Sequence, residues 1–130
     1  MGRTGNERLG NMNIVIPVAA KTVLTENTIV AVGADGYAVS GAKAEGFIAA
    51  GRVERLADNG AGEAGDISVE VRRGTFVWDN DGTIKSTDVL KECYIAGSTS
   101  VTITAEGASP AGIILAVDED GVTVDMTQKR

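Results

Sequence analysis

Short apolar runs separated by turn residues are the feature that most limits what this chain can fold into. They begin at residue 14, and glycine, aspartate and asparagine, which favour tight turns, lie between them. Short runs bounded by such residues are typical of antiparallel β-strands. The pattern predicts strands at residues 14–18, 28–33, 36–39, 46–56, 66–78, 93–96, 100–105, 111–118 and 121–126.

Two of these runs alternate between apolar and polar residues. Val101 and Ile103 alternate with threonines, and Val122 and Val124 alternate with a threonine and an aspartate. A period of two places one set of side chains in a core and the other in water. The run at residues 111–117 is apolar on both faces, which predicts a central strand.

Aspartate followed by glycine separates apolar runs at residues 35–36, 81–82 and 120–121. This pair tolerates the positive φ of tight turns, so each occurrence predicts a β-hairpin, with the second a weaker copy of the pattern. The acidic turns at 79–82 and 118–121 also resemble the middle of an EF-hand calcium loop. They lack the glutamate six residues after the glycine, and strands are expected on both sides, so hairpin turns are predicted, with weak adventitious cation binding as the alternative.

The predicted strand at residues 66–78 changes the side on which its apolar residues fall. Val69 and Val71 lie at odd positions, whereas Phe76 and Trp78 lie at even ones. A change of parity with a glycine at the switch is typical of a β-bulge. We therefore expect a bulge or sharp bend at residues 73–74, of the kind that forms the corner of a small barrel.

The length of 130 residues suits one domain, and an aromatic content of 4% predicts an aliphatic core. Residues 86–92 begin with helix-capping residues and are expected to form a short helix or 3₁₀ turn. The glycine-rich stretch 57–65 is expected to be an exposed, mobile loop. Residues 1–12 lack apolar periodicity and are expected to be a flexible arm or an added extension. The prediction is a single all-β domain at residues 13–128, a small antiparallel β-barrel or sandwich with one short helix.

Composition excludes several kinds of chemistry. The chain has no histidine, which removes Ser-His-Asp triads, Cys-His dyads and histidine-based zinc sites. Cys93 is the only cysteine, so the chain forms no internal disulfide, and we expect a small buried residue in a reducing compartment. No phosphate-binding loop is present. Carboxylate pairs of the glycosidase type remain as an alternative, but the acidic residues lie mostly at turns. We expect no enzyme activity and no cofactor.

The charge balance also limits the partners. Eighteen acidic residues face 12 scattered basic ones, giving a net charge of -6. Nucleic acids and anionic membrane surfaces both need clustered lysine and arginine, so neither is an expected partner. No apolar run approaches the ~20 residues that cross a bilayer as a helix.

Three residues are candidates for a partner interface. Arg72 and Arg73 form a basic pair on a predicted strand of an acidic protein. The pair is either a solvated face or part of an interface, because arginine is enriched at protein contacts. Trp78, the only tryptophan, is either a core residue near the bend, which we favour, or an interface anchor.

The order of these segments resembles the small cement, or head-decoration, proteins of tailed bacteriophages and prophages. The resemblance covers roughly residues 14–126 and depends on the ordered set, since no single motif in it is specific. The segments that carry it are residues 17–20, 29–39, 50–54, 58–59, 65–76, 87–95, 101–104 and 111–124.

The resemblance implies a compact β-barrel-like domain that binds the outside of an assembled capsid at junctions between major capsid protein subunits. Such proteins clamp the shell against the pressure of the internal DNA, and many are trimers. The implied location is the exterior of the virion, after synthesis in the cytoplasm of the host bacterium. The family has no catalytic residues to carry over and no fixed capsid-contacting motif. The alternatives are another phage subunit, such as a tail-tube or connector protein, and a small ligand-binding β module.

Overall fold

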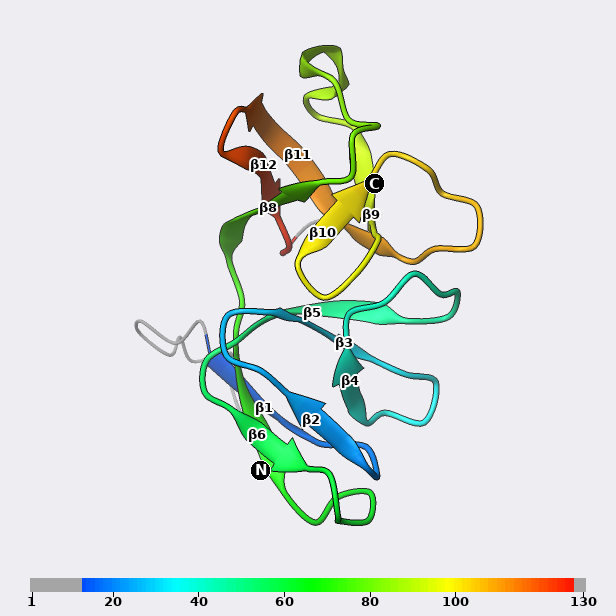
Figure 1. The fold of residues 1–130 in the computed structure, drawn as a ribbon, viewed down its shortest axis with the longest axis vertical. Helices are drawn as coiled ribbons and strands as arrows, with labels where there is room; N and C mark the ends of the chain where they lie inside the picture. Colours follow the sequence, from blue (N-terminus) through cyan, green and yellow to red (C-terminus); the bar gives the residue numbers. More distant parts are fainter. Residues whose placement is uncertain (1–12, 128–130) are drawn as a thin grey trace, which may run out of the picture.

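A computed structural model describes residues 13–127 and consists almost entirely of β-strands (Figure 1). The all-β prediction is therefore confirmed. Two halves follow one another along the chain, and we call them the sheet half (residues 13–72) and the barrel half (residues 75–127).

The sheet half contains one five-stranded antiparallel sheet in the order β1-β7-β5-β3-β4, and a two-stranded sheet formed by β2 and β6. A single parallel bridge between Val18 and Ala38 joins the end of β1 to β4, so the edges of the larger sheet come together. The bounds are β1 (Asn13–Pro17), β2 (Thr22–Leu24), β3 (Ile29–Val32), β4 (Ala38–Ser40), β5 (Ile48–Val53), β6 (Ala57–Asn59) and β7 (Ser68–Arg72).

The barrel half closes five strands in the order β10-β8-β12-β11-β9. Its pairs are antiparallel except β8 with β10, which run parallel. The bounds are β8 (Thr75–Asn80), η1 (Ser86–Asp88), β9 (Glu92–Ile95), β10 (Ser100–Thr102), β11 (Pro110–Asp118) and β12 (Gly121–Asp125).

Each half has its own aliphatic core, and β3 contributes to both. Val30 packs in the core of the sheet half, whereas its neighbours Ile29 and Ala31 pack in the core of the barrel half. The alternation of side chains along a strand explains this, because β3 has one core on each face. The two halves therefore share a strand as well as the linking peptide.

The bend predicted at residues 73–74 is confirmed, and it separates two strands. β7 ends at Arg72 in the sheet half, and β8 begins at Thr75 in the barrel half, where Figure 1 shows the chain rising from one half into the other. Apolar residues change parity here because β7 faces one core and β8 faces the other.

Two of the three predicted hairpins are confirmed. β3 and β4 pair across the turn at residues 35–36, and β11 and β12 pair across the turn at 120–121. The hairpin predicted at residues 81–82 is wrong, because the chain continues into η1 and β8 pairs with β10 and β12 instead. The side chain of Asn80 accepts hydrogen bonds from the backbone N–H groups of Gly82 and Ile84, which turns the chain locally without a returning strand.

The exposed loop predicted at residues 57–65 is wrong in its first third. Residues 57–59 form β6 and pair with β2, a strand that the sequence pattern did not reveal. Asn59 is only 3% exposed, and its Nδ2 donates to the carbonyl oxygens of Ala19 at 2.9 Å and Glu63 at 3.0 Å. This buried amide holds the glycine-rich turn against the segment that follows β1. The helical segment predicted at 86–92 is a single 3₁₀ turn, η1.

Candidate protein-interaction surface

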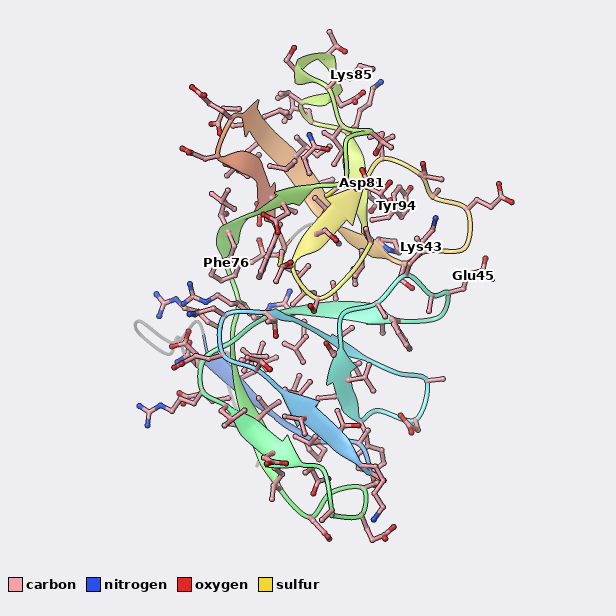
Figure 2. All side chains as sticks on the ribbon, viewed as in Figure 1. Lys43, Glu45, Phe76, Asp81, Lys85 and Tyr94 are labelled. Atoms are coloured by element: carbon pink, nitrogen blue, oxygen red, sulfur yellow. The ribbon has the colours of Figure 1, made fainter. Side chains whose placement is uncertain are left out.

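The four arginines among residues 13–127 lie at one place, where the sheet half meets the barrel half. Arg52 is on β5 and Arg72 is its register partner on β7. Arg55 follows β5, and Arg73 follows Arg72. Nitrogen-tipped side chains gather at the left of Figure 2, next to Phe76 and between the two halves. Pairing of β5 with β7 therefore brings together residues that are about 20 positions apart.

Arg52, Arg55 and Arg72 form what we call the arginine face. Arg52 Nη2 lies 2.8 Å from Glu54 Oε1, and Arg55 Nε lies 3.7 Å from Glu70 Oε1. The guanidinium of Arg52 also stacks over the ring of Phe76, with its central carbon 4.8 Å from the ring centroid. Two carboxylates thus offset part of the repulsion that cationic side chains on paired strands produce.

All three arginines of the arginine face lower the pKa of Glu54. The hydrogen bond from Arg52 is the largest cause that holds the pKa of the Glu54 carboxyl below its ordinary value. Burial opposes it, and the charges of Arg52, Arg72 and Arg55 each lower the pKa by a smaller amount. Glu54 is therefore a carboxylate at neutral pH, already engaged by Arg52. It orients that guanidinium on the face.

Arg72 is the arginine on this face that is available to a partner. Its side chain is exposed and forms no hydrogen bond or salt bridge with any residue in the described part of the chain. A guanidinium presents its donors in a planar fork that matches a carboxylate. The chain as a whole is acidic, but this face carries three arginines against two glutamates. The local excess of positive charge suits a negatively charged protein surface.

Arg73 points away from the arginine face toward a cavity of about 170 Å³ between the two halves. Its Nη2 donates a 3.4 Å hydrogen bond to the carbonyl oxygen of Met126. The structure thus separates the two residues of the predicted basic pair. The other residues that line this cavity are Phe47, Ile48, Ala49, Pro110, Ala111, Met126 and Thr127.

Trp78 lies in the core of the barrel half and is 5% exposed. Its ring centroid is 6.0 Å from that of Phe76, at an interplanar angle of 58°. Its inclusion as a candidate partner contact is corrected here, because a side chain this buried cannot reach another molecule. The favoured interpretation, a core residue near the bend, is the one that the structure supports.

The remaining candidates for chemistry are structural. Cys93 is fully buried, and burial raises the pKa of its thiol to about 12, so it is protonated at neutral pH and unreactive in the folded state. Within residues 13–127, no three acidic or cysteine side chains are arranged to hold a metal ion. In the turn at 118–121, Asp118 Oδ1 accepts a 2.9 Å hydrogen bond from the N–H of Asp120, which is a hairpin-turn role.

Searches for relatives add nothing to this description: family models, curated proteins and solved structures gave no match. In the described part of the chain, no helix is long and apolar enough to cross a membrane.

Sequence reasoning found Arg72 and Arg73 but missed Arg52, Arg55, Glu54 and Glu70. The run of charged residues at 52–55 is visible in the sequence, yet it gives no sign that β5 lies beside β7. The pairing register of β5 with β7 would have shown that these residues meet. That register is fixed by long-range packing, which the local sequence does not reveal.

Proposed function

We propose that this protein is a structural virion component that decorates and stabilises a phage capsid by binding the outer surface of assembled major capsid protein. The observation that carries the proposal is the arginine face, a concentrated cationic contact surface on an acidic all-β body. The order of strands and turns, which resembles capsid cement proteins, supplies the class of partner. The proposal assigns the chain no catalysis and no cofactor.

Stabilisation by this route needs no chemistry. A protein that binds the assembled shell and not its dissociated subunits shifts the equilibrium toward the shell by mass action. Repetition of the site over the lattice multiplies a modest contact, and self-association into a trimer, the state we favour, would increase the effect through avidity. Arg72 supplies charge-assisted hydrogen bonds to a carboxylate of the capsid protein.

Co-sedimentation tests the proposal. Purified full-length protein is mixed with empty capsids assembled from the major capsid protein of the same genome, and the bound fraction is measured over a range of concentrations. We expect saturable binding that weakens as salt is raised. Arg72→Glu should weaken it by about tenfold or more, because the substitution places a like charge against an acidic surface.

Lys43→Glu is the matched control. It makes the same change of charge, and Figure 2 places Lys43 on the opposite side of the molecule from Phe76, the ring over which Arg52 stacks. It should leave capsid binding near that of the unmodified protein. Absence of saturable binding would contradict the proposal. Rings or long tubes formed by the protein alone, measured by light scattering and electron microscopy, would favour a tail-tube or connector subunit.

A further inference from the structure

The cavity beside Arg73 is too small for a whole small-molecule ligand. Its volume is about 170 Å³, whereas pockets that enclose such ligands occupy roughly 300–1,000 Å³. It lies where β5, the strand of the sheet half nearest the barrel in Figure 1, meets the start of β11 and the end of β12. A cavity of this size matches a single large side chain.

The walls of the cavity are mainly apolar, with one cation. Phe47 and Ala49 come from the sheet half, and Ala111 and Met126 come from the barrel half. Arg73 adds a guanidinium that forms no salt bridge with any residue among 13–127, although the chain has 18 acidic residues. Its hydrogen bond to Met126 is long at 3.4 Å. An apolar group with a carboxylate next to it would satisfy both features.

The cavity is formed before any partner arrives. Ser109, which is buried, donates a 2.6 Å hydrogen bond to the carbonyl oxygen of Ala44 and accepts a 3.0 Å hydrogen bond from the N–H of Phe47. This hydroxyl ties the segment before β5 to the start of β11, and Phe47 and Pro110 beside these contacts both line the cavity. A preformed cavity binds without the entropic cost of ordering its walls.

One wall of the cavity continues onto exposed apolar surface. Ile48, at the start of β5, is 65% exposed and lines the cavity beside Ala49. Arg73 is also the residue next to Arg72, so the cavity and the arginine face lie on either side of one short connection. A partner segment that enters the cavity is therefore close to a second cationic contact. Interface hot spots lie in well-packed pockets and are enriched in arginine.

We propose that this cavity receives one large apolar side chain of the capsid protein, and that a carboxylate adjacent to that side chain pairs with Arg73. The identity of the partner rests on the proposed function. The chemistry of the site, an apolar group beside a carboxylate, rests on the cavity alone and is testable without a capsid.

The probe is N-acetyl-L-leucine, which carries an apolar side chain and a carboxylate, compared with N-acetyl-L-leucinamide, which lacks the charge. Titration is followed by amide chemical shifts of the ¹⁵N-labelled full chain. We expect binding on the order of millimolar for the acid, with the largest shifts at Ala49, Ala111 and Thr127, and at least about fivefold weaker binding of the amide.

Three variants make the test specific. Arg73→Gln should reduce binding of the acid to that of the amide, and Ala49→Leu, which fills the cavity, should weaken both probes. Lys43→Gln is the matched control, because it removes a cation that neither lines the cavity nor belongs to the arginine face, and it should leave both affinities unchanged. Because the Arg73 side chain is partly exposed, Arg73→Gln is expected to fold. It therefore tests the inference even if Ala49→Leu fails to fold. Equal binding of acid and amide, or shifts centred elsewhere, would overturn the inference.

Capsid co-sedimentation of the same variants separates this inference from the proposed function. If the unmodified protein binds capsids and Arg73→Gln and Ala49→Leu bind equally well, the cavity inference fails and the function stands. If the probes behave as expected but the unmodified protein does not bind capsids, the capsid assignment fails and the ligand class stands. Loss of capsid binding in both variants supports the two together.

Discussion

The two halves of the molecule use similar short strands but close their cores differently. The barrel half joins its five strands into a ring, so its strand pairs leave no open sheet edge. The sheet half has two edge strands, β1 and β4, brought together by the single bridge between Val18 and Ala38 and completed by the β2–β6 pair. Leu24 of β2 and Ala57 of β6 are buried in the core of the sheet half, so this pair helps to cover that core.

The cores also differ in the side chains that fill them. The sheet half packs small and branched aliphatic residues, whereas the barrel half adds the larger side chains of Trp78 and Met126. β3 connects the two because Ile29 and Ala31 enter one core and Val30 the other. One strand can therefore serve two cores, one on each of its faces. This shared strand also predicts that the halves unfold together, as one domain.

The largest expected effect comes from a glycine in each half that touches a neighbouring strand. A Cβ at Gly51 would overlap the carbonyl oxygen of Arg72, and a Cβ at Gly112 would overlap that of Asp125, both well inside 3.0 Å. Gly51 also has a φ of 151°, which glycine favours. Because backbone atoms cannot swing aside, Gly51→Ala and Gly112→Ala should each lower the free energy of unfolding by about 3 kcal/mol or more.

Urea unfolding followed by circular dichroism measures this loss. Gly46→Ala is the control, because Gly46 has a φ of 84° but no atom within 4 Å of an added Cβ. It should lose only about 1 kcal/mol, the conformational contribution. Losses at Gly51 and Gly112 no larger than at Gly46 would show that the strands can move apart.

The second expected effect tests whether the halves unfold as one unit. Leu24 lies in the core of the sheet half and Ile114 in that of the barrel half, and both are fully buried. Leu24→Ala and Ile114→Ala should each cost about 2–5 kcal/mol. Trp78 is the only tryptophan, so its fluorescence reports the barrel half, whereas circular dichroism reports both.

In one cooperative unit, Leu24→Ala shifts the Trp78 fluorescence midpoint as much as the circular dichroism midpoint, although Leu24 is in the other core. Val23→Ala, at a neighbouring residue that is 47% exposed, is the control and should change stability by about 0.5 kcal/mol or less. A fluorescence transition unmoved by Leu24→Ala would divide the chain into two domains and contradict the single-domain prediction.

The sequence predicted local features better than pairings between distant segments. Alternation at Val122 and Val124, the hairpin at 120–121 and the bend at 73–74 are local patterns, and the structure contains all three. In the sheet half, β2 and β6 are three residues each and lie more than 30 residues apart. No local pattern shows that two such short segments pair, because their stability comes from the core that they cover.

The candidate surface shows the same limit. Arg72 and Arg73 are visible as a basic pair, but adjacent residues on extended chain point to opposite sides. One therefore reaches the arginine face and the other reaches the cavity. The assignment of Arg52 to the same face as Arg72 depends on the β5–β7 register. A sequence supplies the residues of such a surface, and long-range pairing decides which of them meet.

The smallest expected effect compares one carboxylate in each half under acid. The hydrogen bond from Arg52 lowers the pKa of Glu54 from 4.5, and the backbone N–H of Lys85, with a contribution from Lys91, lowers the pKa of Asp88 from 3.8. A lowered folded-state pKa means that each carboxylate stabilises the fold fully above its unfolded-state pKa. That contribution is lost as pH falls through the lowered, folded-state value.

Carbon-13 NMR titration of the side-chain carboxyls measures both values, and the variants should separate the two halves. Arg52→Gln should return the Glu54 pKa toward 4.5 and leave Asp88 unchanged, because the dominant donor to Glu54 is a side chain. Lys91→Gln should raise the Asp88 pKa only in part, because the dominant donor, at 2.8 Å, is a backbone N–H that no substitution of Lys91 removes. An unchanged Glu54 pKa in Arg52→Gln would contradict this, because it would mean that the Arg52 side chain does not hold Glu54. The strand backbone alone would then order the arginine face. Arg72, which forms no salt bridge within residues 13–127, would then remain the arginine expected to bind a partner.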